Sequence, residues 1–349
     1  MARDRAVVRV TVYVGIVTYN SAADLPVCFA ALNVQTYPDI QITVLDNASS
    51  DGSAAWAAAN APHARLIESA LNVGYGRGHN RILSTLTLHP GDFYLTLNPD
   101  VQLAPNYISA LVNALADDPR IGWATGKLIQ PDTDPPLLYS AGHALLRGGF
   151  AFNIGYGLPD TAAFDVPRRV FGAPGAAALY SADLIAGISC GADFFDPALF
   201  LYAEDTDVDW RANLAGWQCG YIPAATALHR GSTPTGRLKS MAIANRYLSV
   251  IKNAALLDLF AYNLPYMLAH CLARLIVSPA FGWTLTRELV RHLPDVLRRR
   301  TPNINRDINQ AWFHWSAQQP STQRSAAQRI TDRLARSRLG QRDRGDGQP

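Results

Sequence analysis

Hydrophobic and polar positions alternate along the first 130 residues in a way that predicts strands and helices in turn. Short runs rich in Val, Ile and Leu are typical of buried strands, whereas the longer segments between them have helical character. The expected strands are 7–17, 40–45, 65–67, 93–97 and 121–128, and the expected helices are 22–34, 53–59, 78–88 and 107–116. This alternation predicts parallel βαβ units, in which ligands bind beyond the carboxyl ends of the strands.

The rest of the chain divides into segments of different character. Residues 130–172 are rich in Pro and Gly and predict a loop-rich, flexible region. The elements expected after it are a strand running into a helix at 176–184, a helix at 205–216, a strand at 221–229 and helices over 238–300. We therefore expect an α/β domain over 1–235, a helical region over 236–302 and a basic, largely disordered tail over 303–349.

Composition excludes some classes of protein. Of the 349 residues 48% are hydrophobic, which suffices for a sizeable core, and a net charge of +3 does not indicate a nucleic-acid partner. The four cysteines form no CxxC pair, so we expect reduced thiols and no zinc site. The N-terminal segment lacks the apolar core of a signal peptide, and no uncharged run is long enough to span a bilayer. We expect a cytoplasmic protein.

Acidic and amide side chains follow the predicted strands. Asp100 lies in the segment LNPDV, where Pro99 ends a strand and leaves the carboxylate at its tip. A carboxylate in that position suits Mg²⁺ or Mn²⁺, which prefer oxygen ligands and can bridge a diphosphate. An ordinary Asn-Pro-Asp turn is the simpler explanation of this segment taken alone.

Two further segments offer groups suited to a nucleotide. Asp46 and Asn47 follow the second strand, where an acidic side chain can accept hydrogen bonds from a base or a ribose. Ser50 or Asp51 is also expected to cap the next helix. The glycines of NVGYGRGHN, residues 72–80, do not match a dinucleotide-binding loop, but they would let the backbone approach a diphosphate closely. A plain helix-entry loop is the alternative.

A third cluster is acidic. The segment AEDTDVDW brings Glu204, Asp205, Asp207 and Asp209 to the start of a predicted helix, where the helix dipole favours negative charge. A carboxylate there is also a candidate general base. His229 ends a later strand-like run, and both a structural role and metal ligation remain open for it.

Each cluster is weak alone, but their order and spacing resemble one protein family. Seven segments follow one another within residues 8–235: VTYN, LDNASSDGS, LNVGYGRGHNR, LNPDV, GAAALYSADLI, FDPALFLYAEDTDVDWRANLAGW and ALHRGS. In this order they resemble the family 2 glycosyltransferases, especially the rhamnosyltransferase-like branch that builds bacterial surface polysaccharides. The resemblance implies a GT-A fold, a mixed and mainly parallel α/β sheet flanked by helices. It also implies an inverting transfer that uses a divalent metal.

The resemblance implies roles for single residues around the donor. Those expected to bind the nucleotide sugar are Thr18, Tyr19, Asn20, Asp46, Asn47, Asp51, Gly74, Gly78, Asn80, Asn98 and Asp100. Asn98 and Asp100 occupy the place of the family's Asp-x-Asp signature. Asp100 would therefore be the main ligand of Mg²⁺ or Mn²⁺, and His229 would be the second metal ligand.

Catalytic roles are implied in the same way. Asp205 would be the general base, with Glu204 as the alternative, and Trp210 or Trp217 would either stack on the acceptor sugar or pack in the core. The expected reaction moves a sugar, with rhamnose as a candidate, from a nucleotide-diphosphate sugar to a saccharide or lipid-linked saccharide. A nucleotidyltransferase and an inactive GT-A-like scaffold in a polysaccharide assembly complex are the alternatives.

The helical region carries an apolar stripe. Leu268, Leu272, Leu275 and Ile276 recur at helical spacing, and basic residues follow at Arg291, Arg298, Arg299 and Arg300. This pattern predicts docking on the inner face of the cell membrane, with the arginines near anionic headgroups. Packing of the stripe on the catalytic domain or on a second copy in a homo-oligomer is the alternative.

Overall fold

The computed structural model describes residues 10–146, 149–231 and 234–300. The strands in these ranges are β1 (Val12–Thr18), β2 (Ile40–Asp46), β3 (Arg65–Glu68), β4 (Phe93–Leu97), β5 (Val101–Leu103), β6 (Ile121–Gln130), β7 (Leu137–Ser140), β8 (His143–Leu145), β9 (Ala151–Asn153), β10 (Arg168–Val170), β11 (Ala177–Ser181) and β12 (Gln218–His229). The helices are α1 (Leu25–Asn33), α2 (Ser53–Asn60), α3 (Tyr75–Leu83), α4 (Tyr107–Asp117), η1 (Ala162–Phe164), α5 (Ala182–Ile188), α6 (Glu204–Leu214), α7 (Gly236–Asn253), α8 (Leu256–Asp258), η2 (Leu259–Asn263), α9 (Leu264–Val277) and α10 (Pro279–Arg298).

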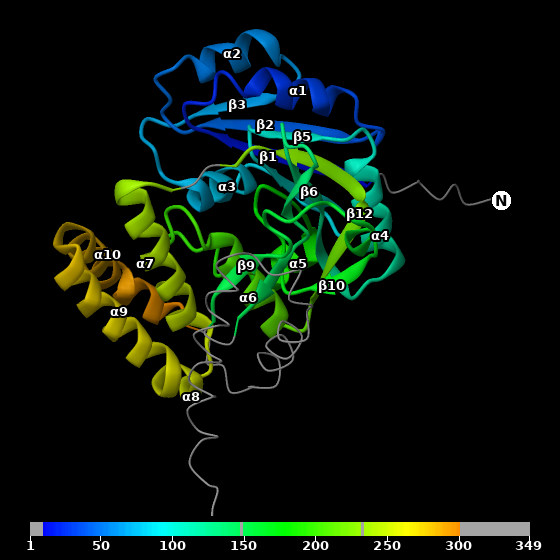
Figure 1. The fold of residues 1–349 in the computed structure, drawn as a ribbon. Coiled ribbons are helices and arrows are strands. Elements are labelled where there is room, and N and C mark those ends of the chain that lie inside the picture. Colours follow the sequence, from blue (N-terminus) through cyan, green and yellow to red (C-terminus); the bar gives the residue numbers. More distant parts are fainter. Residues whose placement is uncertain (1–9, 147–148, 232–233, 301–349) are drawn as a thin grey trace, which may run out of the picture.

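A ten-stranded mixed sheet forms the centre of the described structure (Figure 1). Its order is β10-β12-β6-β11-β4-β1-β2-β3, with β5 added to β12 and β7 added to β6. The strands β3, β2, β1 and β4 are mutually parallel, as are β6 and β12, whereas β11 runs antiparallel between β4 and β6. The predicted fold class, a mixed α/β sheet flanked by helices with a helical C-terminal region, is confirmed.

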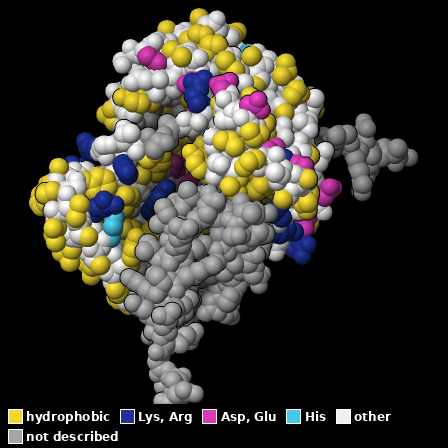
Figure 2. Space-filling model, viewed as in Figure 1, with side chains coloured by type: hydrophobic (Ala, Val, Ile, Leu, Met, Phe, Trp, Pro, Cys, Tyr) yellow, Lys and Arg dark blue, Asp and Glu magenta, His cyan; other side chains and the backbone are white. Residues whose placement is uncertain are grey.

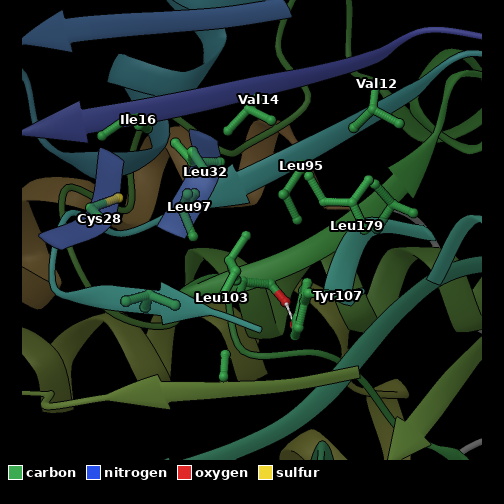
Figure 3. Close-up of a cluster of buried hydrophobic side chains, with 14 of the residues drawn as sticks. Val12, Val14, Ile16, Cys28, Leu32, Leu95, Leu97, Leu103, Tyr107 and Leu179 are labelled. Atoms are coloured by element: carbon green, nitrogen blue, oxygen red, sulfur yellow. Dashed lines mark hydrogen bonds between the residues drawn. The ribbon is translucent and has the colours of Figure 1, made fainter. Parts of the chain in front are cut away.

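Helices cover both faces of this sheet. On one face, side chains of α1, α2 and α4 pack on β1, β4 and β11 in a cluster that contains Val14, Leu32, Leu95 and Tyr107 (Figure 3). On the other face, α3, α5 and α6 pack on the sheet around Tyr94 and other buried aromatic rings. Burial of both apolar faces removes a large area from water, and this drives the association of the layers.

Several predicted elements differ from those observed. The helix expected at 78–88 is Tyr75–Leu83, because Gly76 and Gly78 let α3 lie against the chain: a Cβ on Gly78 would come within 2.8 Å of Val17. The loop-rich region 130–172 in fact contains β7 to β10 and η1, and β5 was not predicted. These strands are only three or four residues long, which is too short to show a period. Residues 7–9 and 303–349 lie outside the described residues.

The first helix of the C-terminal region, α7, begins at Gly236 and packs on α6 through buried charges. Lys252 Nζ on α7 lies 2.6 Å from Asp196 and 2.9 Å from Asp207 of α6, and Arg211 Nε lies 2.9 Å from the same Asp207 carboxylate. Burial would raise the pKa of Asp207, but the charges of Lys252 and Arg211 lower it to about 2. We call these four residues the α6–α7 ion cluster.

The outer side of α9 is uncovered in the structure. Leu268, Leu272 and Ile276 are 60–80% exposed, so this part of the predicted stripe does not pack on the α/β domain. Figure 2 shows hydrophobic side chains over much of the lobe formed by α9 and α10. None of the helices among the described residues is long and apolar enough to cross a bilayer.

Two of the four arginines predicted to lie near headgroups make contacts within the protein. Arg299 pairs with Asp193 at 3.2 Å, and Arg300 donates hydrogen bonds to the backbone carbonyls of Ile251 and Ala254. Both guanidinium groups therefore tie the end of α10 to the protein. Their spacing in the sequence does not reveal these partners.

Candidate active site

The carboxyl ends of β1 and β2 bring two predicted donor-binding residues together. Thr18 and Asp46 are neighbours in the parallel register of these strands. Both are buried, and Thr18 Oγ1 and Asp46 Oδ1 have no hydrogen-bond partner among the described residues. Buried polar atoms are usually paired, so these two unpaired oxygens are candidates for hydrogen bonds to a polar ligand.

The loops after β1 and β2 are hydrogen-bonded to each other. Asn20 Oδ1 accepts from the Ser50 backbone N–H at 2.8 Å, and Asp51 accepts from the backbone N–H of Ala22 at 2.8 Å and of Ser53 at 3.0 Å. Asp51, and not Ser50, thus binds the first turn of α2, although Gly52 occupies the N-cap position. Asn20 and Asp51 hold the shape of this edge, while Tyr19 between them is 51% exposed.

Asn47 and Asn80 are occupied by protein contacts. Asn47 Oδ1 accepts from the Val73 N–H at 2.8 Å, and Asn47 Nδ2 donates to Asn72 at 3.0 Å. Asn80 exchanges hydrogen bonds with the backbone of Phe195 at 2.7 and 2.9 Å. These two side chains position loops around the site.

Gly74 and Gly78, which were predicted to bind the donor, are needed for close packing within the protein. Gly74 has φ +88°, and a Cβ there would lie 2.2 Å from the carbonyl oxygen of Phe200. A Cβ on Gly78 would meet Val17. The close approach that these glycines permit in this structure is to the protein's own chain, and neither residue lines the cavity described below.

The predicted metal ligands meet at the edge of the sheet. In the antiparallel pairing of β5 with β12, His229 is opposite Val101, so Asp100 comes beside the imidazole. His229 Nε2 lies 3.4 Å from Asp100 Oδ1, and the second oxygen of Asp100 accepts from the Gly231 N–H at 3.1 Å. Asn98, at the end of β4, lines the same region. The cluster was predicted from the sequence, but this strand pairing was not.

The donor set fits a divalent cation that a substrate also coordinates. Adjacent ligands about 2.1 Å from one ion are about 3 Å apart, close to the observed separation. Burial would raise the pKa of Asp100, but the hydrogen bond and charge of His229 lower it below its ordinary value, so the carboxylate is ionised. No group of three or more His, Cys, Asp or Glu ligands occurs among the described residues. Asp100 and His229 would thus supply two ligands to such an ion, and waters or substrate oxygens would supply the others.

The two predicted catalytic carboxyl groups begin α6 after an unusual turn. Tyr202 and Ala203 both have φ +69°, a left-handed conformation that is costly for residues with a side chain. This turn directs Glu204 and Asp205 toward the interior. Asp205 is half-buried, accepting from the backbone N–H of Gly175 at 3.1 Å and of Thr206 at 2.7 Å.

Glu204 has a different environment. Its side chain is buried, and Oε2 has no hydrogen-bond partner among the described residues. Burial, with a smaller contribution from the negative charge of Asp205, raises the pKa of Glu204 well above its ordinary value. Glu204 therefore favours its protonated form, which is poorly suited to accept a proton. Asp205 is the better placed of the two for that role.

The other acidic residues of α6 form ion pairs and hydrogen bonds with neighbouring side chains. Asp207 belongs to the α6–α7 ion cluster, and Asp209 lies 2.8 Å from His143 and accepts from Trp123 Nε1 at 2.9 Å. Trp210 is buried, and neither it nor Trp217 lines the cavity, which favours core packing over sugar stacking.

A cavity of 430 Å³ connects these groups, between the sheet and the helical lobe. The predicted residues that line it are Asn98, Glu204, Asp205 and His229. The lining residues that sequence reasoning missed include Tyr75, Tyr139, His143, Phe150 and Arg246. In Figure 2 the surface is hollowed between the lobe and the body of the protein. Nothing in the spacing of the missed residues distinguishes them, because they come from distant segments.

Comparisons with known proteins agree with this geometry. The model of the family described as glycosyl transferase family 2 matches residues 13–158. The N-acetylglucosaminyl-diphospho-decaprenol L-rhamnosyltransferase of Mycobacterium tuberculosis is 33% identical over 236 residues, which cover 63% of this chain and 76% of that protein. An undecaprenyl-phosphate 4-deoxy-4-formamido-L-arabinose transferase of Yersinia enterocolitica is 37% identical over 101 residues, 27% of this chain and 30% of that protein.

A solved structure is similar in fold. The crystal structure of GalNAc-T7 with UDP, GalNAc and Mn²⁺ superimposes with a TM-score of 0.51 at 14% identity. The match covers 70% of this chain and 48% of that chain, so the present chain corresponds to about half of it. At this identity the likeness establishes a shared fold and nothing finer.

Proposed function

The chain belongs to glycosyl transferase family 2 and has a GT-A-type fold, and on this basis we propose an inverting transfer of a sugar from a nucleotide-diphosphate sugar to a saccharide or lipid-linked saccharide. The observation that carries this proposal is the single cavity that contains Asp205 and His229, with Asp100 against the imidazole. An inverting displacement needs one base and a stabilised leaving group, and this cavity offers both.

The donor nucleotide binds at the ends of β1 and β2. Support comes from the unpaired oxygens of Thr18 and Asp46, which can accept or donate hydrogen bonds to a base or a ribose. Asn20 and Asp51 keep the two loops in register. Tyr19 is exposed next to them and offers a ring face to the nucleotide.

The diphosphate lies at Asn98, Asp100 and His229. Asp100 and His229 would hold Mg²⁺ or Mn²⁺, which supplies Lewis-acid stabilisation of the diphosphate leaving group. Asn98 stands in for an acidic residue and contributes an amide that can bind a phosphate oxygen. A half-buried site strengthens each of these electrostatic contacts relative to bulk water.

Asp205 accepts the proton of the acceptor hydroxyl while that hydroxyl attacks the anomeric carbon from the face opposite the diphosphate. The backbone N–H groups of Gly175 and Thr206 donate hydrogen bonds to the carboxylate and fix its orientation. Burial raises the pKa of Glu204 and favours its protonated form, which would add no second negative charge to the site. No covalent sugar–enzyme intermediate is needed.

Rhamnose is the proposed sugar, and bacterial surface polysaccharide synthesis the proposed role. The rhamnosyltransferase of M. tuberculosis named above supports both, together with the order of the seven sequence segments. That relative's name also supports a lipid-linked saccharide as acceptor.

The uncovered face of α9 fits such an acceptor, because it would dock the enzyme on the inner surface of the cell membrane. Leu272 and Ile276 are 60% and 80% exposed there. The test is flotation of the full chain with anionic vesicles, comparing wild type with a Leu272→Asp, Ile276→Asp double variant. Val166→Asp, at a 58% exposed position outside the lobe, is the control. Loss of binding in the double variant alone supports docking, whereas a dimer that the double variant breaks shows that the face binds a second copy.

The reaction itself is tested with a panel of nucleotide-diphosphate sugars, including an L-rhamnose donor, and a saccharide acceptor. Release of nucleoside diphosphate together with an elongated saccharide supports the proposal. Release of pyrophosphate would show a nucleotidyltransferase instead. Absence of any transfer across the panel would favour an inactive scaffold.

A further inference from the structure

Two basic side chains line the cavity on the side of the helical lobe. Arg246 comes from α7 and His143 from β8, and both line the same 430 Å³ cavity as Asp205. Arg246 has no ion pair or hydrogen bond with a described residue, and its side chain is accessible. The proposed leaving-group site contains its own charged groups, so it does not account for this guanidinium.

The acidic residues that follow Asp205 on α6 are already paired with other groups and do not supply a partner for Arg246. Asp207 on the facing helix is taken up by Lys252 and Arg211, and Asp209 by His143 and Trp123. The protein around Arg246 lowers its pKa by removing water, and the negative charge of Asp205 acts in the opposite direction. The side chain nevertheless remains exposed to solvent at the cavity wall, where an anionic ligand can reach the guanidinium.

His143 is oriented by a hydrogen bond at one ring nitrogen, so the other ring nitrogen can bind a ligand in the cavity. Asp209 Oδ2 lies 2.8 Å from His143 Nδ1, which leaves Nε2 without a hydrogen bond to a described residue. A Cβ on Gly172 would lie 1.8 Å from the same carboxylate oxygen, so only glycine leaves room for this pair. Burial would lower the pKa of His143, but the hydrogen bond and charge of Asp209 raise it, which favours the cationic imidazolium.

An apolar route leads from this wall to the surface. Phe150 lines the cavity, and its ring centroid lies 5.8 Å from that of Tyr247 and 5.9 Å from that of Tyr266 on α9. Tyr266 is 54% exposed and belongs to the lobe that carries the uncovered apolar face. Asp205, the basic pair and Phe150 thus line one cavity, and Phe150 contacts the rings of Tyr247 and Tyr266 beside the apolar helix.

We propose that Arg246 and His143 form a phosphate subsite for the acceptor, which binds the phosphate linking the acceptor saccharide to its lipid. The inference rests on the proposed function, since Asp205 serves as the base for the same acceptor. The three parts of a lipid-linked saccharide match the order of groups along the cavity. The saccharide lies at Asp205, the phosphate at Arg246 and His143, and the lipid along Phe150 and Tyr266. Guanidinium groups suit this task because their planar N–H donors bind two phosphate oxygens at once.

The test compares two acceptors that differ only in the linking group. One carries the saccharide on a short-chain lipid diphosphate, and the other carries it on a neutral alkyl group of equal length. Wild type, Arg246→Gln, His143→Gln and Arg237→Gln are compared for transfer with each acceptor and for hydrolysis of the donor alone. Arg237 is the matched control, because it lies on the same helix, is exposed and pairs with Glu288 outside this cavity.

Arg246→Gln should raise the KM for the diphosphate acceptor about 10- to 100-fold, the effect expected for loss of a charged hydrogen bond. The KM for the neutral acceptor, the KM for the donor and donor hydrolysis should stay unchanged. His143→Gln should act in the same direction with a smaller effect, and Arg237→Gln should match wild type. Arg246→Lys, which keeps the charge, should recover part of the loss. Thermal midpoints establish that each variant is folded.

Equal losses with both acceptors, a raised donor KM or slower donor hydrolysis would show that Arg246 serves the donor diphosphate, and the inference would be wrong. Unchanged kinetics throughout would also overturn it. Calorimetric titration of the diphosphate acceptor without donor separates this inference from the proposed function. If wild type transfers no sugar but binds this acceptor through Arg246, the proposed function fails while the phosphate subsite stands. If it transfers sugar and binds both acceptors equally, only the subsite is refuted.

Discussion

Replacing Asp205 with Asn tests the assignment of the base most directly, because the two side chains have nearly the same shape. The amide cannot accept the proton of the acceptor hydroxyl. Turnover should fall about 10²–10⁴-fold, which corresponds to about 3–5 kcal/mol of activation free energy. The affinity for the donor should hardly change, because the nucleotide contacts proposed at β1 and β2 are separate from α6.

The structural cost of this substitution is small enough to leave the protein folded. Asp205 accepts from two backbone N–H groups, those of Gly175 and Thr206. Asn has one acceptor oxygen, so one N–H loses its partner, at about 1–3 kcal/mol of folding stability. Domains are typically stable by about 5–15 kcal/mol, so the thermal midpoint should drop without loss of the fold.

The assay measures nucleoside diphosphate release at saturating donor and acceptor, with donor affinity titrated separately. Glu204→Gln is the matched control. Since burial favours the protonated form of Glu204, this change replaces one neutral side chain by another, and activity should stay within a few-fold of wild type. If Glu204→Gln has the large effect and Asp205→Asn the mild one, the assignment of the base and the electrostatic reasoning behind it are both wrong.

Three further predictions concern the metal, the pH response and the ion cluster. Excess chelator should abolish sugar transfer, and Asp100→Ala should lower the transfer rate by several orders of magnitude. Both effects are measured as product formed with and without added Mn²⁺. Full activity in excess chelator would contradict the proposed metal. Burial lowers the pKa of His79 to about 3, so the stability it contributes is complete above pH 6.5 and is lost as pH falls. Between pH 7 and pH 5 the unfolding free energy of wild type should fall by about 2 kcal/mol more than that of His79→Gln, as measured by denaturant unfolding. Equal losses in the two proteins would refute the assignment. Lys252→Met leaves Asp196 and Asp207 buried without their shared cation and should lower the unfolding free energy by about 3–5 kcal/mol. An unchanged unfolding free energy would show that the cluster is dispensable for stability.

The sequence predicted the fold best where the elements are long and local. The strands β2 and β4 and the helix α4 were predicted to within one residue at each end, because each coincides with one apolar run of the sequence, whereas only the end of β1 was predicted this closely. The short strands β7 to β10 were missed, since their conformation is set by neighbours in the sheet and not by a pattern of their own.

The candidate site was predicted in part, for a related reason. Asp100, His229 and Asp205 carry recognisable local segments, and the structure brings them to one cavity edge. His143 and Arg246 do not stand out in the sequence, because their partners and their cavity exist only once β8 and α7 are packed. Their environment, not their spacing, makes them candidates.

The α6–α7 ion cluster also constrains how the chain folds while it is being made. Asp196 and Asp207 emerge from the ribosome before Lys252, so they lack the cation that they share until α7 has been synthesised. Until then we expect α6, the helix that carries Asp205, to be incompletely packed against the rest of the α/β domain. The packing of α6, and with it the position of Asp205, is therefore expected to depend on the synthesis of α7.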